Sequence, residues 1–60
     1  MSNQIHPSAV IEEGAQLGDN VTIGAFCSIG PNVVLGDNVI ISEGAIVPDN
    51  TVIPAGTTWP

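Results

Sequence analysis

The segment GDNVTIG, residues 18–24, recurs eighteen positions later as GDNVIIS, residues 36–42. A finer period runs through the whole chain, because a large apolar residue stands at every sixth position. These positions are Ile5, Ile11, Leu17, Ile23, Ile29, Leu35, Ile41, Val47, Ile53 and Trp59. Apolar residues at this spacing cannot form one stripe on a helix of about 3.6 residues per turn. The pattern therefore predicts an all-β fold.

The hexads predict short strands joined by corners. A small or β-branched residue stands two positions before each large one after Ile5, as Val21 does before Ile23 and Cys27 before Ile29. Side chains two apart on a strand share a face, so each hexad supplies one small and one large inward side chain. Gly or Pro often follows the large residue, as expected where the chain turns. A hexapeptide period of this kind is the signature of a parallel β-helix.

The eighteen-residue interval predicts three hexads in each triangular coil. Residues i and i+18 would then lie about 4.8 Å apart on successive coils. The 60 residues would form about three coils of a single domain, residues 1–60. Asn20 would lie over Asn38, and Asn32 over Asn50, each at a corner. We expect a positive φ at these corners, because Asn tolerates this conformation better than most residues.

The run IHPSAVIEEGAQLGDNVTIGAFCSIGPNVVLGDNV, residues 5–39, resembles the opening coils of the hexapeptide-repeat acyltransferases. It is most similar to the bacterial UDP-N-acetylglucosamine acyltransferases. Residues 40–60 resemble the final coil of other hexapeptide proteins, in the phrase VPDNTVIPAGT. The resemblance implies a left-handed β-helix, a homotrimer and, in the enzymes, acyl transfer at clefts between subunits. The handedness is implied by the resemblance alone, since parallel crossovers are otherwise right-handed.

Composition favours a structural role over catalysis. The chain has no Lys or Arg and a formal net charge of −6. Coenzyme A, acyl carrier protein, UDP-sugars and nucleic acids are polyanions that are held by cationic side chains or oriented backbone amides. No loop interrupts the hexads, whereas loops or extra domains complete the active sites of relatives. We therefore expect a self-associating β-helix module without a self-contained active site, a cofactor or a nucleic-acid partner. The alternative is an acyltransferase, or a fragment of one, that uses carrier-linked acyl donors at intersubunit clefts.

His6 is the only histidine and so the only candidate for the general base that acyl transfer in this family uses. In relatives, the IHP phrase forms an ordinary corner and is not the catalytic position. A solvated corner residue is therefore the expected role. A His₃ zinc site of the γ-carbonic anhydrase type would need three copies of His6 to meet on a trimer axis, which is a minor alternative.

Three further side chains have more than one interpretation. Asp19 is predicted to lie over Asp37, with about 5 Å between successive coils. Hydrated corners are the expected interpretation, and a calcium site is the alternative. Cys27 is interpreted as a core residue, because a nucleophilic thiol needs an exposed, electropositive pocket.

Outward positions beside the core residues predict an interface. Five of the nine are aliphatic, and an exposed apolar strip on so small a body usually marks a contact surface. The predicted interface residues among them are Val10, Val34, Ile40, Ile46 and Val52. Phe26, at a corner between Ser8 and Gly44, is predicted to add to this interface. We expect a homo-oligomer, with a trimer favoured. Trp59 is predicted to cap the C-terminal end by stacking on Ile41, and end-to-end association is a further expectation because the N-terminal end is less protected.

Location and origin follow from what the sequence lacks. It contains neither an eighteen-residue apolar run nor a basic segment followed by a hydrophobic one. We therefore expect no membrane span, no membrane partner and no signal peptide, and a cytoplasmic location. The uninterrupted hexads and short length also fit a designed unit or a truncated piece of a longer hexapeptide protein.

Overall fold

The computed structural model describes residues 3–59 and contains ten strands of two residues each. The strands are β1 (Gln4–Ile5), β2 (Val10–Ile11), β3 (Gln16–Leu17), β4 (Thr22–Ile23), β5 (Ser28–Ile29), β6 (Val34–Leu35), β7 (Ile40–Ile41), β8 (Ile46–Val47), β9 (Val52–Ile53) and β10 (Thr58–Trp59). No helix able to cross a membrane lies within residues 3–59. The prediction of an all-β fold is confirmed.

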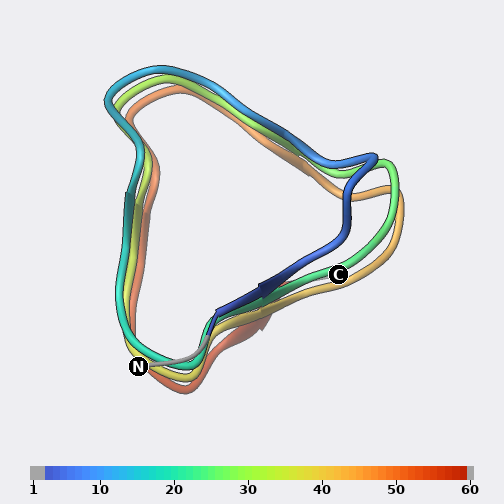
Figure 1. Cartoon of the computed structure of the whole chain (residues 1–60). Helices are drawn as coiled ribbons and strands as arrows, with labels where there is room; N and C mark the ends of the chain where they lie inside the picture. Colours follow the sequence, from blue (N-terminus) through green and yellow to red (C-terminus); the bar gives the residue numbers. More distant parts are fainter. Residues whose placement is uncertain (1–2, 60) are drawn as a thin grey trace.

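The strands form three parallel sheets around a triangular prism (Figure 1). Sheet A has the order β1-β4-β7-β10, sheet B the order β2-β5-β8, and sheet C the order β3-β6-β9. Paired residues are eighteen apart, as Ile5 is from Ile23. In Figure 1 the chain runs counter-clockwise from its blue start while later coils recede. The β-helix is therefore left-handed, as the resemblance implied.

The core is concentrated in the middle of the prism. Its cluster of buried residues comprises Val21, Ile23, Cys27, Ile29, Val33, Leu35, Val39, Ile41, Ala45, Val47 and Ile53. Ile11, Leu17 and Trp59 pack against this cluster but are only partly buried, and Ile5 is 40% exposed. Full burial of a Leu or Ile side chain contributes about 1.5–3 kcal/mol. The central coil therefore supplies most of the hydrophobic stabilisation.

Asparagine occupies the left-handed conformation at four corners, as predicted. The φ angles of Asn20, Asn32, Asn38 and Asn50 lie between 59° and 61°. The amides at two of these corners also bond to the preceding coil. Asn38 N donates to the Asp19 carbonyl at 2.8 Å, and Asn50 N donates to the Pro31 carbonyl at 3.1 Å. The corners thus contribute to holding successive coils together.

Backbone hydrogen bonds run from each coil to the next in a fixed register. The outward residue of a strand donates to the carbonyl seventeen residues later, as Gln4 N does to Val21 O at 2.9 Å. The first corner residue after the strand does the same, as His6 N does to Ile23 O at 3.0 Å. The amide protons at these two positions of a hexad are therefore accepted by the following coil, whereas corner amides such as Asn38 N donate to the preceding one.

Candidate functional site

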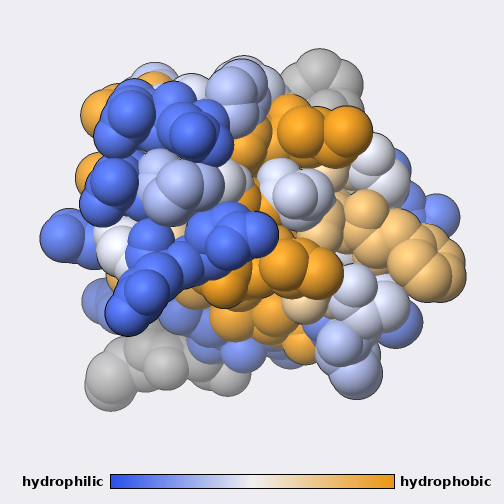
Figure 2. Space-filling view, turned by 90° about the horizontal axis from the view of Figure 1, so that it is seen from above, coloured by the Kyte–Doolittle hydropathy of each residue, from blue (hydrophilic) through white to orange (hydrophobic). Residues whose placement is uncertain are grey.

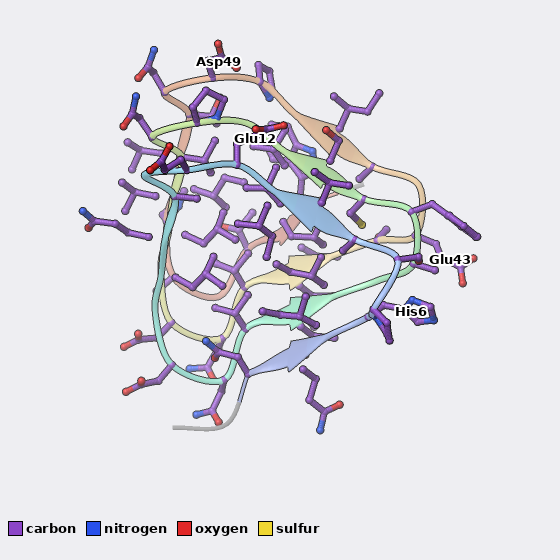
Figure 3. All side chains as sticks on the ribbon, turned by 45° about the horizontal axis from the view of Figure 1, so that its top comes forward. His6, Glu12, Glu43 and Asp49 are labelled. Atoms are coloured by element: carbon purple, nitrogen blue, oxygen red, sulfur yellow. The ribbon has the colours of Figure 1, made fainter. Side chains whose placement is uncertain are left out.

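The corner between sheets A and B carries the only histidine of the chain. It is built from residues 6–9, 24–27 and 42–45, which stack on successive coils. His6 and Glu43 point outward from this corner (Figure 3). Both residues line a shallow, open depression together with Asn3, Thr22 and Gly24. The depression exposes its lining to solvent rather than enclosing a substrate.

His6 is held by its own turn. Its Nδ1 accepts a hydrogen bond from the Ser8 backbone N–H at 3.1 Å and lies 2.8 Å from Ser8 Oγ. Because a backbone N–H can only donate, Nδ1 is unprotonated and the neutral ring carries its proton on Nε2. A general base needs an unprotonated nitrogen within reach of the substrate. In His6 the unprotonated Nδ1 is engaged by Ser8, and the other nitrogen, Nε2, carries the proton. This geometry favours the corner role for His6, and its part in catalysis stays a prediction.

Ser8 connects this turn to the second coil. Its Oγ accepts a hydrogen bond from Phe26 N at 3.0 Å. The same hydroxyl can donate to His6 Nδ1, because a hydroxyl both donates and accepts. His6, Ser8 and Phe26 therefore form a hydrogen-bonded chain across two coils. Its effect is to fix the backbone at Phe26.

Phe26 has an unusual conformation for a bulky residue. Its φ is 60°, and it is the only residue in the stretch 3–59 other than Asn or Gly with a positive φ. Its side chain is 75% exposed. The sequence predicts Phe26 at a corner and in the interface, but the residue type does not indicate this backbone conformation. The available signal was its position, six residues from both Asn20 and Asn32.

The stacked carboxylates are arranged around a backbone amide. Asp37 Oδ1 accepts a hydrogen bond from Asp19 N at 2.9 Å. This contact accounts for the position of Asp37 without a shared cation. Across residues 3–59, no three His, Cys, Asp or Glu side chains gather closely enough to hold a metal ion. Calcium binding by Asp19 and Asp37 stays untested.

Cys27 lies inside the prism on the path from sheet A to sheet B. It is 1% exposed, and its Sγ donates to the Ser42 carbonyl at 2.9 Å. A thiol reacts as an exposed thiolate. The burial and the hydrogen bond therefore give Cys27 a packing role.

The predicted interface residues are all exposed. The exposed fractions of Val10, Phe26, Val34, Ile40, Ile46 and Val52 lie between 37% and 75%. On sheet B, Val10 and Ile46 pair with Ser28 from opposite sides. On sheet C, Val34 pairs directly with Val52. Their exposure fits a contact surface, and contact with another copy stays a prediction.

Sheet B shows a division between apolar and polar halves. Figure 2 views this face, where apolar side chains gather over one half and hydrophilic ones over the other. We define the sheet B patch as Val10, Phe26 and Ile46, whose exposed fractions are 54%, 75% and 71%. Glu12 and Asp49 point outward at the corner between sheets B and C (Figure 3). The apolar patch is therefore bordered by carboxylates at one edge.

Family comparison agrees with this architecture. The model described as bacterial transferase hexapeptide (six repeats) matches residues 2–30 and residues 14–49. The chain belongs to the bacterial transferase hexapeptide family. In this hexapeptide-family chain, the matched segments include the corner at His6 and the whole central coil. No solved structure gave a significant match.

Curated relatives of the hexapeptide-family chain match it over short segments. The acyl-(acyl-carrier-protein)–UDP-N-acetylglucosamine O-acyltransferase of Aliarcobacter butzleri (strain RM4018) is 74% identical over 23 residues, which are 38% of this chain and 9% of that protein. The protein of the same name from Campylobacter jejuni subsp. jejuni serotype O:23/36 (strain 81-176) is 82% identical over 22 residues, 37% of this chain and 8% of the relative. The chain therefore spans less than a tenth of the length of these relatives, and the resemblance to hexapeptide-repeat acyltransferases is confirmed.

Proposed function

We propose that this hexapeptide-family chain is a structural β-helix module that associates laterally as a homotrimer and has no self-contained active site. The observation that carries the proposal is the exposed Phe26 at a positive φ. A left-handed conformation costs a residue with a Cβ about 1–2 kcal/mol. Asn or Gly, which stand at the other positive-φ corners, would reduce this cost.

Burial within the chain does not offset the cost at Phe26, because three quarters of the side chain is exposed (75%). A bulky aromatic residue that strains the backbone and remains in water contributes little to the fold of its own chain. Aromatic residues are enriched at protein interfaces, where burial of the ring supplies binding energy. Contact with another copy therefore explains why a bulky aromatic residue stands at this corner.

The other two residues of the sheet B patch extend the apolar surface around Phe26. Val10 and Ile46 lie above and below Ser28, and Phe26 stands two residues before Ser28. The chain has no Lys or Arg, so ion pairs between Lys or Arg and carboxylates cannot hold the copies together. Apolar burial must instead overcome the repulsion between acidic copies.

The test compares Phe26→Asn with Phe26→Tyr. Asn relieves the backbone strain and removes the ring, so we expect weaker association together with unchanged or higher thermal stability of the monomer. Tyr keeps the ring and the strain, and should associate like the wild type. Sedimentation velocity measures the association, and circular dichroism measures the stability. A wild-type monomer at micromolar concentration, or trimers in the Asn variant, would count against the proposal.

A second candidate is a part of an acyltransferase. The identities of 74% and 82% to the two relatives favour it. The substrates in their name, UDP-N-acetylglucosamine and an acyl-carrier-protein donor, are the ones to assay. The engagement of His6 Nδ1 by Ser8 N and the absence of Lys and Arg argue against turnover by this chain alone. Turnover that His6→Ala abolishes and Ser8→Ala preserves would rank this candidate first.

A further inference from the structure

The two ends of the β-helix differ in the backbone groups that they offer. Seven first-corner residues donate their N–H to the carbonyl seventeen positions later: His6, Glu12, Gly18, Gly24, Gly30, Gly36 and Ser42. Their N–O distances lie between 2.9 and 3.0 Å. The series stops at Ser42, which donates to Trp59 O. Beyond it, the described residues contain no further coil to accept these protons.

Proline stands at the first-corner positions for which the described residues contain no acceptor carbonyl. The next two first-corner positions are Pro48 and Pro54, and the one after them is Pro60, which lies outside the described residues. None of the seven preceding first-corner residues is a proline. The remaining prolines, Pro7 and Pro31, stand at the second corner position. Proline therefore occupies each first-corner position of the sequence from residue 48 onward.

Proline at a first-corner position changes the edge in two ways. Proline has no backbone N–H, so the two first-corner positions at this edge, Pro48 and Pro54, offer no donor to a further coil. The Cδ of the ring takes the place of the hydrogen and points where a further coil would present its carbonyl. Edge strands of soluble proteins are commonly protected from pairing by proline in this way.

Side-chain bulk adds to this obstruction. Four covered first-corner positions are glycine, namely Gly18, Gly24, Gly30 and Gly36. A Cβ built at these glycines would lie 2.5–2.9 Å from a backbone nitrogen of the next coil. His6, Glu12 and Ser42 carry a Cβ at covered first corners. Room is therefore tightest at the glycine corners, and a pyrrolidine ring adds its Cδ to the Cβ.

We propose that Pro48 and Pro54 close the C-terminal edge of this β-helix to head-to-tail stacking of a second copy. In a gapless continuation of the hexads, β1 of the second copy would follow β10 and lie on β8. With the same seventeen-residue register, residue 48 would face the carbonyl of Ile5 of the second copy, and residue 54 would face that of Ile11. Each proline meets this carbonyl with a ring carbon instead of a proton. The proposal concerns backbone edges and stands independently of lateral association. It also limits the expected end-to-end association, because a head-to-tail contact needs the C-terminal edge.

The test is the double variant Pro48→Gly/Pro54→Gly, which restores both donors and the room that glycine provides in covered coils. We expect at least a doubling of the weight-average mass relative to the wild type, increasing with concentration. Electron microscopy should show particles elongated along the helix axis. The matched control is Pro7→Gly/Pro31→Gly, which makes the same chemical change where no open donor position exists. The control should keep the wild-type mass.

Three outcomes would overturn the proposal. The first is wild-type particles that already stack end to end. The second is a folded Pro48→Gly/Pro54→Gly variant with the wild-type size distribution. The third is equal elongation of the control, which would attribute assembly to loosened corners. If circular dichroism shows that the glycine variant is unfolded, Pro48→Ser/Pro54→Ser restores the donors with the residue type that Ser42 shows at a covered first corner, and the same criteria apply to it.

Discussion

Asp37 Oδ1 accepts a hydrogen bond from the backbone N–H of Asp19, eighteen residues earlier and 2.9 Å away. The contact turns a pair of stacked acidic residues into a link between coils. Removing the acceptor by Asp37→Ala should lower the free energy of unfolding by about 0.5–1 kcal/mol, as expected for one exposed hydrogen bond. Asp37→Asn keeps an acceptor oxygen and should remain close to the wild type. Urea unfolding measures both, and equal stability of the two variants would contradict the role of the contact.

His6 should show the Nε2–H tautomer in its neutral form. The reason is that Nδ1 accepts the Ser8 N–H at 3.1 Å, so the remaining proton stays on Nε2. Long-range proton–nitrogen correlation spectra of labelled protein report which nitrogen carries the proton. A dominant Nδ1–H tautomer would show that the turn does not hold the ring. Ser8→Ala removes the hydroxyl but keeps the amide, and should preserve the tautomer.

Trp59 should stabilise the last coil. It pairs with Ile41 in sheet A and is partly buried against the core. We expect Trp59→Ala to lower the free energy of unfolding by about 2 kcal/mol, below the usual 3–5 kcal/mol for a fully buried aromatic residue. Its particle size should stay at the wild-type value, because Pro48 and Pro54 still close the C-terminal edge. Trp59→Phe is the matched control and should stay near the wild type in melting temperature and particle size. An unchanged transition in Trp59→Ala would remove the case for a cap.

Association should strengthen as salt is added. Each copy has a net charge of −6 and no Lys or Arg, so the copies repel one another and screening reduces this repulsion. The dissociation constant from sedimentation should therefore fall between low and physiological ionic strength. Sucrose at constant salt controls for viscosity and density. A dissociation constant that rises with salt would indicate attraction between opposite charges.

Much of the fold could be predicted because each residue of the hexad has one geometric role. Ile23, Ile29 and Leu35 recur every six residues and are all buried. The left-handed corners were predictable where Asn stands, since the residue type itself indicates the conformation. Phe26 shares that conformation, but its residue type argues against it. Position in the repeat determined φ there, and propensity did not.

The contacts between coils were harder to predict than the coils. Stacking alone places the like charges of Asp19 and Asp37 about 5 Å apart, and the sequence does not show which atoms face each other. The backbone amide of Asp19 resolves this conflict by donating to the Asp37 carboxylate. The significance of Pro48 and Pro54 likewise depends on the seventeen-residue hydrogen-bond register. The hexad pattern specifies columns of residues but does not show the direction of the amide protons.

The eighteen-residue pairing has a consequence for the order of folding. No strand pairs with its neighbour in sequence, because every observed partner is one full coil away. A single coil therefore loses conformational entropy without gaining any strand contact. We expect the nucleus to form from the two adjacent coils that bury Ile29, Leu35 and Val47, with β1 and β10 adding last. Leu35→Ala should then slow refolding, whereas Ile5→Ala should mainly accelerate unfolding.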